Sequence, residues 1–292
     1  MQAEKKWVVF IFVFLVALVI SQRSIQFGMD TRNYIRILTD VSSYTSSLLQ
    51  NSDSFLFVKI LKVFLGYPKF FFFAASFFLL LVSVLKIDKI YGSHRLVAMI
   101  LFLLSWPLKA YLFTAIAQSI TLSFIILYMT SGNTRSRWLY LISAVGFHYQ
   151  SGLLFSVLIL LSELVSRLKK WEELSSLKKI TLVCLALLIS GSLSSLLESN
   201  LTEQYIGESN YVTGWNLGRA LLFGIIALAL VKIDLRYNWF FFAALSAYSV
   251  LIYYPYSDRV LSSVLVLYCF MLLKSSRKVW PIYLTYLSGF GL

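Results

Sequence analysis

The sequence predicts an all-α, polytopic integral membrane protein with about ten transmembrane helices. Hydrophobic residues make up 59% of the 292-residue chain and charged residues only 13%, whereas soluble domains have roughly 45–50% apolar and ~25% charged residues. Apolar runs that are long enough to cross a bilayer recur from Trp7 to Leu273. The polar segments between these runs are short and carry most of the lysines and arginines, which is typical of membrane-protein loops.

Each predicted transmembrane helix is an apolar run bounded by polar residues. The first run follows Lys5 and Lys6 and lacks a small-residue cleavage site, so we predict a retained signal anchor. Pro107 removes a backbone donor between the third and fourth runs, so we expect a helix break there. The predicted crossings are residues 7–22, 69–86, 95–106, 108–130, 136–149, 151–166, 179–197, 216–232, 237–254 and 259–273.

The basic residues predict the orientation of the chain. Lysine and arginine outnumber aspartate and glutamate by 26 to 13, and most lie in alternate loops, so the positive-inside rule predicts that both termini are cytoplasmic. The opposite face then holds segment 23–68, with an interfacial helix at 53–67, and loop 198–215. No stretch suits a separate soluble domain of ~100–150 residues, so residues 1–292 are expected to form a single transmembrane domain. Membrane lipids are an expected partner of the basic loops, and nucleic acid is not.

In this topology the unusual polar residues gather on the external face. The first of them lie in FGMDTRNYIRIL, residues 27–38, directly after the first crossing. Several arginines around a partly dehydrated pocket indicate an anionic ligand such as a diphosphate, because a guanidinium pairs two donors with phosphate oxygens. The gathered residues are Asp30, Arg32, Tyr34, Arg36, Asp53, Lys109, His148, Arg219, Tyr256, Asp258 and Arg259.

Each candidate also has a purely structural interpretation. An arginine or lysine near the end of a crossing is usually a snorkelling anchor, which is the favoured interpretation for Arg23 and Lys69. For Arg219 and Arg259 a functional role is favoured, because charges within membrane segments usually serve a site. His148 fits a structural hydrogen bond and proton transfer equally well.

Several chemistries lack a sequence pattern in this chain. There is no cysteine–histidine set with metal-ligand spacing, no glycine-rich phosphate loop and no serine in a nucleophile-elbow pattern. Fixed cations can stabilise a leaving diphosphate without a metal. We therefore expect no metal site and no cofactor.

Several sparse positions of the chain form a pattern: Gly28, Asp30, Tyr34, Asp53 and Phe55, Gln118 in AIAQSITLSFIILYM, His148 in FHYQSGLLF, and the pair Asp258 and Arg259. This pattern resembles the EpsG-like branch of the Wzy O-antigen and capsular polysaccharide polymerases. The resemblance extends from about Phe27 to Leu273. Two positions differ, since Ala117 stands where the family often has arginine and Asp53 where it favours glutamate; Lys109, Arg32 and Arg219 are candidates to replace the missing arginine.

The resemblance implies a multi-pass enzyme of the bacterial inner membrane whose active site faces the periplasm. Enzymes of this kind transfer a growing glycan from undecaprenyl diphosphate onto the non-reducing end of another lipid-linked repeat unit. A chain-length regulator is a candidate partner. A lipid-linked oligosaccharide flippase and a membrane acyltransferase are the alternative functions.

The resemblance also suggests roles for individual residues. Asp30, His148 and Arg259 are the predicted catalytic residues, and Asp30 or His148 would take the proton of the acceptor hydroxyl. Arg32, Arg219 and Arg259 would hold the donor diphosphate. The predicted substrate-binding residues are Arg32, Tyr34, Arg36, Asp53, Lys109, Gln118, Arg219, Tyr256 and Asp258.

Overall fold

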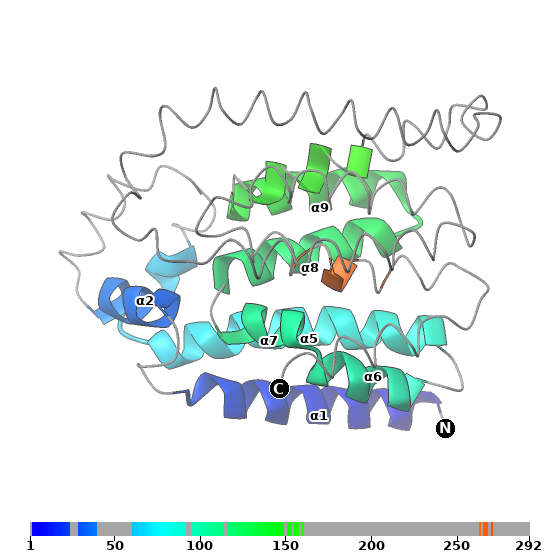
Figure 1. The fold of residues 1–292 in the computed structure, drawn as a ribbon, viewed down its shortest axis with the longest axis horizontal. Coiled ribbons are helices and arrows are strands. Elements are labelled where there is room, and N and C mark those ends of the chain that lie inside the picture. The colour runs from blue at the N-terminus through cyan, green and yellow to red at the C-terminus, as the bar shows by residue number, and fades with distance from the viewer. Residues whose placement is uncertain are drawn as a thin grey trace, which may run out of the picture. The chain divides into compact units, whose positions relative to one another are not determined.

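Every regular element in the described part of the computed structural model is a helix (Figure 1). Among these residues there is no strand, which confirms the all-α part of the predicted fold class. The predicted crossings at 179–197, 216–232 and 237–254 lie outside the described residues, so the number of crossings stays a prediction. The described residues are 2–23, 29–39, 60–91, 95–113, 116–148, 151–153, 155–157, 159–160, 263, 265–267 and 270.

The chain divides into two compact units. The first comprises Met1–Ser156 with Lys278–Leu292, and the second comprises Val157–Arg277. Most described residues belong to the first unit. In the second unit the described positions are helical, and those from 263 to 270 are buried.

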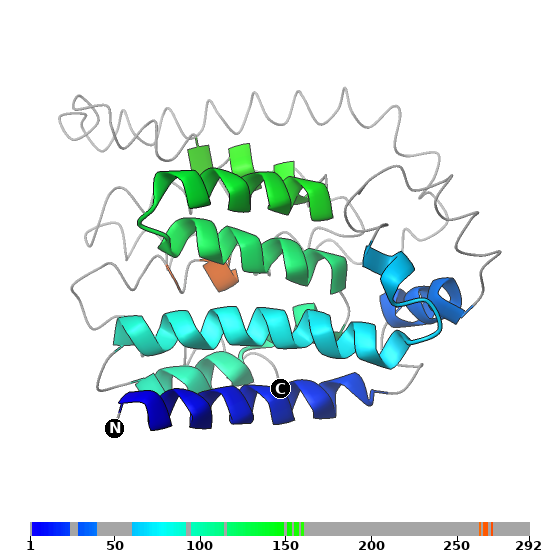
Figure 2. The ribbon, with the colours of Figure 1, turned by 180° about the vertical axis from the view of Figure 1, so that it is seen from behind.

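Four helices form the body of the first unit: α1 (Gln2–Ser21), α5 (Pro68–Tyr91), α8 (Ile116–Thr130) and α9 (Thr134–Phe147). Helix α5 contacts α1 and α8, and α8 also contacts α9, so the four lie side by side in the order α1, α5, α8, α9 (Figure 2). These bounds confirm helices at the predicted crossings 7–22, 69–86 and 136–149.

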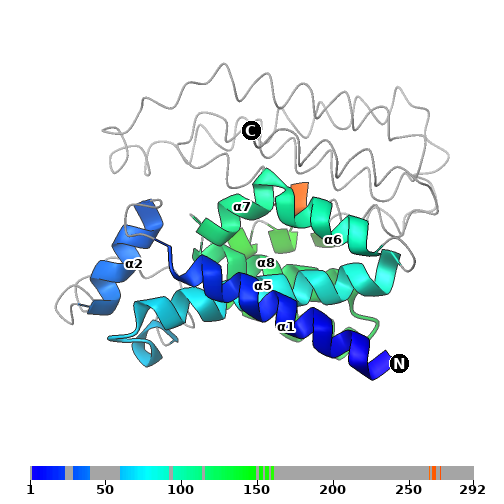
Figure 3. The same cartoon turned by 90° about the horizontal axis from the view of Figure 1, so that it is seen from below.

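Three further helices complete the described part of this unit. Helices α6 (Arg95–Leu104) and α7 (Trp106–Phe113) pack beside α5 and α8 respectively. Helix α2 (Met29–Thr39) lies at one end, where α1 finishes and α5 begins (Figures 1 and 3). We call this the α2 end; α7 and α9 also finish there and α8 begins there.

The two predicted crossings at 95–106 and 108–130 are divided differently in the structure. Helices α6 and α7 follow one another with a bend between them and finish at the α2 end (Figure 3). Their combined length is roughly 28 Å at 1.5 Å per residue, close to the ~30 Å of a bilayer core. The prediction of a single helix at 108–130 is therefore wrong. The first part of this range belongs to α7, which continues from α6 toward the α2 end, and α8 runs back in the opposite direction.

The hydrogen bonds of Ser105 explain the position of the bend between α6 and α7. Its backbone N–H donates to the Phe102 carbonyl at 3.1 Å, and its hydroxyl donates to the same oxygen at 2.6 Å. The Ser105 carbonyl then accepts the Lys109 N–H at 3.2 Å. Pro107 falls in the first turn of α7, where a missing N–H removes no helical hydrogen bond.

The apolar helices of the described part are compatible with a membrane. Within the described residues, Pro68–Lys89 is the one helix that is both long and apolar enough to cross a bilayer, and Trp7–Ser21 and Ile116–Thr130 are shorter apolar helices. Helix α1 also presents apolar side chains outward at four-residue intervals: Trp7, Ile11 and Leu15 are each more than half exposed. Soluble monomers rarely expose contiguous apolar faces of this kind, so the described part is compatible with a membrane protein.

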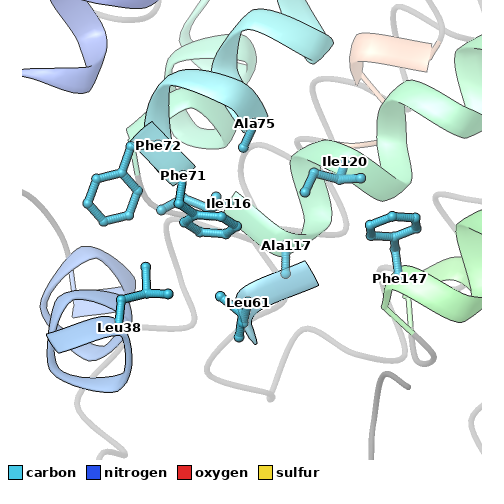
Figure 4. Close-up of a cluster of buried hydrophobic side chains, with 9 residues drawn as sticks. All are labelled: Leu38, Leu61, Phe71, Phe72, Ala75, Ile116, Ala117, Ile120 and Phe147. Carbon is cyan, nitrogen blue, oxygen red and sulfur yellow. The ribbon is translucent and has the colours of Figure 1, made fainter. Parts of the chain in front are cut away.

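A buried apolar cluster joins the elements at the α2 end (Figure 4). Leu38 of α2 and Phe71 of α5 are each 1% exposed, and the ring of Tyr34 packs on Phe71 with 5.7 Å between centroids. Gly66, with φ of +80°, donates its N–H to the Leu38 carbonyl at 2.7 Å. Residues 60–63 are helical and residues 64–67 are not, so the interfacial helix predicted at 53–67 ends earlier than expected; residues 53–59 lie outside the described residues. The cluster comprises Leu38, Leu61, Phe71, Phe72, Ala75, Ile116, Ala117, Ile120 and Phe147.

Gly152 packs directly against the backbone of α9. A Cβ atom at this position would lie 2.4 Å from the Ala144 carbonyl oxygen and 2.6 Å from the Val145 Cα. We expect Gly152→Ala to lower the free energy of unfolding by about 1–3 kcal/mol, because backbone atoms cannot move aside as a flexible side chain can. Denaturant titration of the purified protein in detergent would measure this change.

Gly132 supplies the matched control. It lies in the connection between α8 and α9, and a Cβ there would meet nothing within 4 Å. Gly132→Ala is expected to change the free energy of unfolding by less than about 0.5 kcal/mol. Equal effects of the two substitutions would contradict the close packing at Gly152.

Candidate functional site

The structure describes part of the predicted site. The side chains of Tyr34, Arg36, Lys109, Gln118 and His148 are described, as is the helical backbone at Asp30 and Arg32. The other predicted site residues, Asp53, Arg219, Tyr256, Asp258 and Arg259, lie outside the described residues.

The described candidates meet at the α2 end. Asp30, Tyr34 and Arg36 lie in α2, Gln118 lies in the first turn of α8, and His148 is the C-cap of α9. Leu38, Ile116 and Phe147 of the buried cluster hold these three helices together. Segments that are separated by as many as about 110 residues along the chain therefore share one end of the bundle, as the predicted topology required.

Helix α2 separates a packing face from an exposed face. Thr31 and Leu38 are buried, whereas Arg36 is exposed. Arg32 precedes Arg36 by four residues and so occupies the same side of the helix. Tyr34 is half-buried against Phe71, so its ring contributes to packing. Tyr34 lies on roughly the opposite side of α2 from the two arginines, because two residues correspond to about 200° in a helix with 3.6 residues per turn.

His148 ends α9 and begins the turn to the next helical segment. Its backbone N–H donates to the Ala144 carbonyl at 3.3 Å, and its own carbonyl accepts the Gly152 N–H at 2.7 Å. Its ring Nδ1 accepts the Ser151 N–H at 3.3 Å. A nitrogen that accepts a backbone N–H carries no proton, so in the neutral ring the proton sits on Nε2. In this arrangement His148 is a hydrogen-bond donor through Nε2.

Gln118 and Lys109 are each half-buried. Gln118 follows Ala117 of the buried cluster, and its Oε1 atom is buried without a hydrogen-bond partner. Lys109 lies within α7, one turn before the end of that helix. The helix break expected at Pro107 is present at Ser105, between α6 and α7, and Lys109 lies within the helix that follows the break.

Arg23 is the residue at the α2 end that the sequence interpretation assigned to a simple anchor. Its guanidinium donates through Nη1 to the carbonyl oxygen of Leu112. The guanidinium carbon also lies 4.2 Å from the centroid of the Phe72 ring, a cation–π contact. The Nε and Nη2 atoms are buried and have no hydrogen-bond partner.

The environment of Arg23 differs from that of an anchor in water. Burial lowers the pKa of Arg23 to about 10, because desolvation disfavours the charged form; the group nevertheless stays protonated at neutral pH. Lys69, at the same end, behaves as an anchor, since it is exposed and donates to Gln22 Oε1 at 3.2 Å. An arginine two residues past a membrane helix is the ordinary place for an anchor, so the sequence carried no signal for this burial.

Two carbonyl groups at the end of α7 accept hydrogen bonds from other segments of the chain. Carbonyl groups in the last turn of a helix have no partner within that helix. Arg23 donates to the Leu112 carbonyl, and the buried hydroxyl of Thr31 donates to the Phe113 carbonyl at 3.1 Å. These two bonds attach the end of α1 and the beginning of α2 to the end of α7.

The polar groups in the described part of the site suit binding of an anion or a polar headgroup. Its polar groups are guanidinium, amide, imidazole and hydroxyl. Among the described residues, no group of three or more histidines, cysteines, aspartates or glutamates is placed to hold a metal ion. Fixed positive charge in a poorly hydrated site favours negatively charged groups strongly.

Comparison with known proteins adds no relative to this description. No protein-family model, no curated protein and no solved structure matches the chain. The described fold and site define a helical protein of membrane-compatible composition that has a polar cluster at one end.

The bond between Thr31 and the end of α7 can be tested by removing one hydroxyl. Thr31 is 0% exposed, and Thr31→Val removes the hydroxyl that donates to the Phe113 carbonyl. We expect the free energy of unfolding to fall by about 1–2 kcal/mol, measured by denaturant titration in detergent.

Thr39 provides the same chemical change on the same helix. Its hydroxyl is exposed and donates to the Ile35 carbonyl of α2 itself at 2.7 Å. Thr39→Val is expected to change stability by less than about 0.5 kcal/mol. If Thr31→Val were as mild as Thr39→Val, the proposed attachment of α2 to α7 would carry no stability.

Proposed function

We propose that the protein is a polysaccharide polymerase of the bacterial inner membrane. It transfers a growing glycan from undecaprenyl diphosphate onto the non-reducing end of a second lipid-linked repeat unit at the outer face. The observation that carries this proposal is the meeting of α2, Gln118 and His148 with the buried cation Arg23 at one end of an apolar helical unit. A lipid-linked diphosphate needs this combination of cations and an apolar surround.

The basic residues of the opposite end support an outward-facing site. Helices α5 and α6 are consecutive at that end, as are α8 and α9 (Figure 1). Lys86, Lys89, Arg95, Arg135 and Arg137 belong to these turns or the adjoining helix ends. The positive-inside rule favours a cytoplasmic location for such loops, and the α2 end then faces outward.

The proposed reaction is a displacement at the anomeric carbon of the donor. The acceptor hydroxyl oxygen forms the new bond to this carbon, the bond to the diphosphate oxygen breaks, and its electron pair leaves with the diphosphate. Cations near the leaving oxygen stabilise the charge that develops there. Arg32, Arg219 and Arg259 are the proposed cations.

The hydrogen bond at Nδ1 of His148 favours Asp30 over His148 as the proton acceptor. Since Nδ1 accepts the Ser151 N–H, a neutral His148 holds its proton on Nε2. A ring in this state donates a hydrogen bond to the substrate more readily than it removes a proton. We therefore assign the acceptor proton to Asp30 and a donor role to His148.

Chain extension by the purified protein tests the proposed function. The protein is placed in liposomes with a defined undecaprenyl-diphosphate-linked repeat unit, and the products are separated by length. A polymerase produces a ladder of products together with free undecaprenyl diphosphate. A transporter moves single units across the bilayer and leaves their length unchanged, and that result would contradict the proposal.

His148→Asn tests the donor role without removing the turn. The Asn side-chain oxygen can accept the Ser151 N–H in place of Nδ1, whereas the donor at Nε2 is lost. We expect chain extension to fall by about 10²- to 10⁴-fold with little change in thermal unfolding. His94→Asn, at the other histidine of the chain, is the control and should extend normally. Extension by His148→Asn at the unmodified rate would remove His148 from the mechanism.

A further inference from the structure

The Arg23 guanidinium has more donors than the surrounding protein uses. Of its three nitrogens, Nη1 donates to the Leu112 carbonyl, and Phe72 covers one face of the group. Nε and Nη2 are buried without a partner. A buried donor that lacks an acceptor is costly, and a buried charge that lacks a counter-charge costs more.

Arg23 also lacks a counter-ion among the described residues. Desolvation by burial lowers its pKa. The partners that it does have are a neutral carbonyl and an aromatic ring. The positive charge at this position is therefore not neutralised by the part of the protein that the structure describes.

The unused atoms form one recognition edge. Nε–H and one N–H of the adjacent Nη2 lie in the guanidinium plane and point in parallel from the same edge of the group. This edge pairs with two oxygens of a single carboxylate or phosphate group. Nη1, on the other side, is the atom that caps α7. The cap and the binding edge therefore occupy different sides of one side chain, which can serve both.

Neither simpler role explains this arrangement. A snorkelling anchor keeps its charged group in water, as the exposed Lys69 does at the same end. A helix cap needs one donor, and Arg23 provides that donor through Nη1 alone. Neither the anchor role nor the cap role uses the paired donors at Nε and Nη2.

We propose that Arg23 binds a phosphate group of a polyprenyl diphosphate through its Nε and Nη2 atoms. This inference rests on the proposed function and names a binding residue for the lipid-linked substrate. The phosphate supplies both the missing acceptors and the missing negative charge. Apolar side chains on α1 next to this position suit the isoprenoid tail. Because both donor atoms are covered, binding must also move neighbouring side chains.

The test measures binding of undecaprenyl diphosphate to the full-length protein in phosphatidylcholine nanodiscs. The variants are Arg23→Gln, which removes the charge and the paired donors, and Arg23→Lys, which keeps the charge and a donor for Leu112. Lys69→Gln is the matched control, because it removes an exposed cation from the same end. Thermal unfolding of each protein without the lipid reports on folding separately.

We expect Arg23→Gln to weaken binding of undecaprenyl diphosphate by roughly 10- to 100-fold. Arg23→Lys should have an intermediate effect, since a lysine cannot form the bidentate pair. Lys69→Gln should change the Kd by less than about twofold. A loss of affinity in the well-folded Arg23→Lys protein establishes the role even if Arg23→Gln folds poorly.

Three other outcomes would overturn the inference in different ways. Lower thermal stability of both Arg23 variants with unchanged Kd would make Arg23 only the cap of α7, and the proposed function would stand. Equal, Arg23-dependent binding of phosphatidylglycerol would make the site one for general lipid headgroups. Failure of the unmodified protein to bind undecaprenyl diphosphate at all would overturn the proposed function together with the inference.

Discussion

The end of α7 is the constraint on which the α2 end depends. A helix that stops inside an apolar protein leaves carbonyl groups that water cannot reach, and each needs a donor from elsewhere. The Leu112 and Phe113 carbonyls obtain theirs from Arg23 and Thr31. One of these donors follows α1 and the other lies in α2, so satisfying α7 also determines where the chain goes after its first helix.

The apolar cluster then makes this arrangement rigid. Leu38 and Phe71 bring α2 onto the beginning of α5, while Ile116 and Phe147 bring in α8 and α9. Gly66 adds a backbone bond to the last turn of α2. Close packing of this kind leaves little freedom for the polar groups at its edge. The positions of Gln118 and His148 are consequences of apolar contacts rather than of polar contacts between the two.

In the chemistry proposed for the α2 end, single side chains have both a structural role and a role in substrate binding. Arg23 caps a helix with one nitrogen and keeps a bidentate edge for a phosphate. His148 binds a backbone N–H through Nδ1, which orients the ring and assigns its proton to Nε2. In both residues a structural hydrogen bond fixes the orientation of the side chain. Such fixed orientation is what electrostatic stabilisation of a leaving group requires.

Several helices of the described part could be predicted from the amino-acid sequence. Apolar runs with polar punctuation predicted helices at 7–22, 69–86 and 136–149, and the structure has α1, α5 and α9 there. These features depend on local periodicity and on the solubility of side chains in lipid, which are properties of the chain itself.

Tertiary structure decided the rest. Residues 108–130 are divided between α7 and α8 because the chain reverses after Phe113, whereas the bend at Ser105 lies before this range. Hydropathy cannot locate that reversal, since both sides of it are apolar. Arg23 shows the same limit: its position predicted an anchor, but Phe72 and Leu112 bury it from distant parts of the sequence. Sequence alone determined which segments are helical and apolar. Which polar groups are buried, and which of their atoms lack partners, was decided by contacts between segments far apart in the chain.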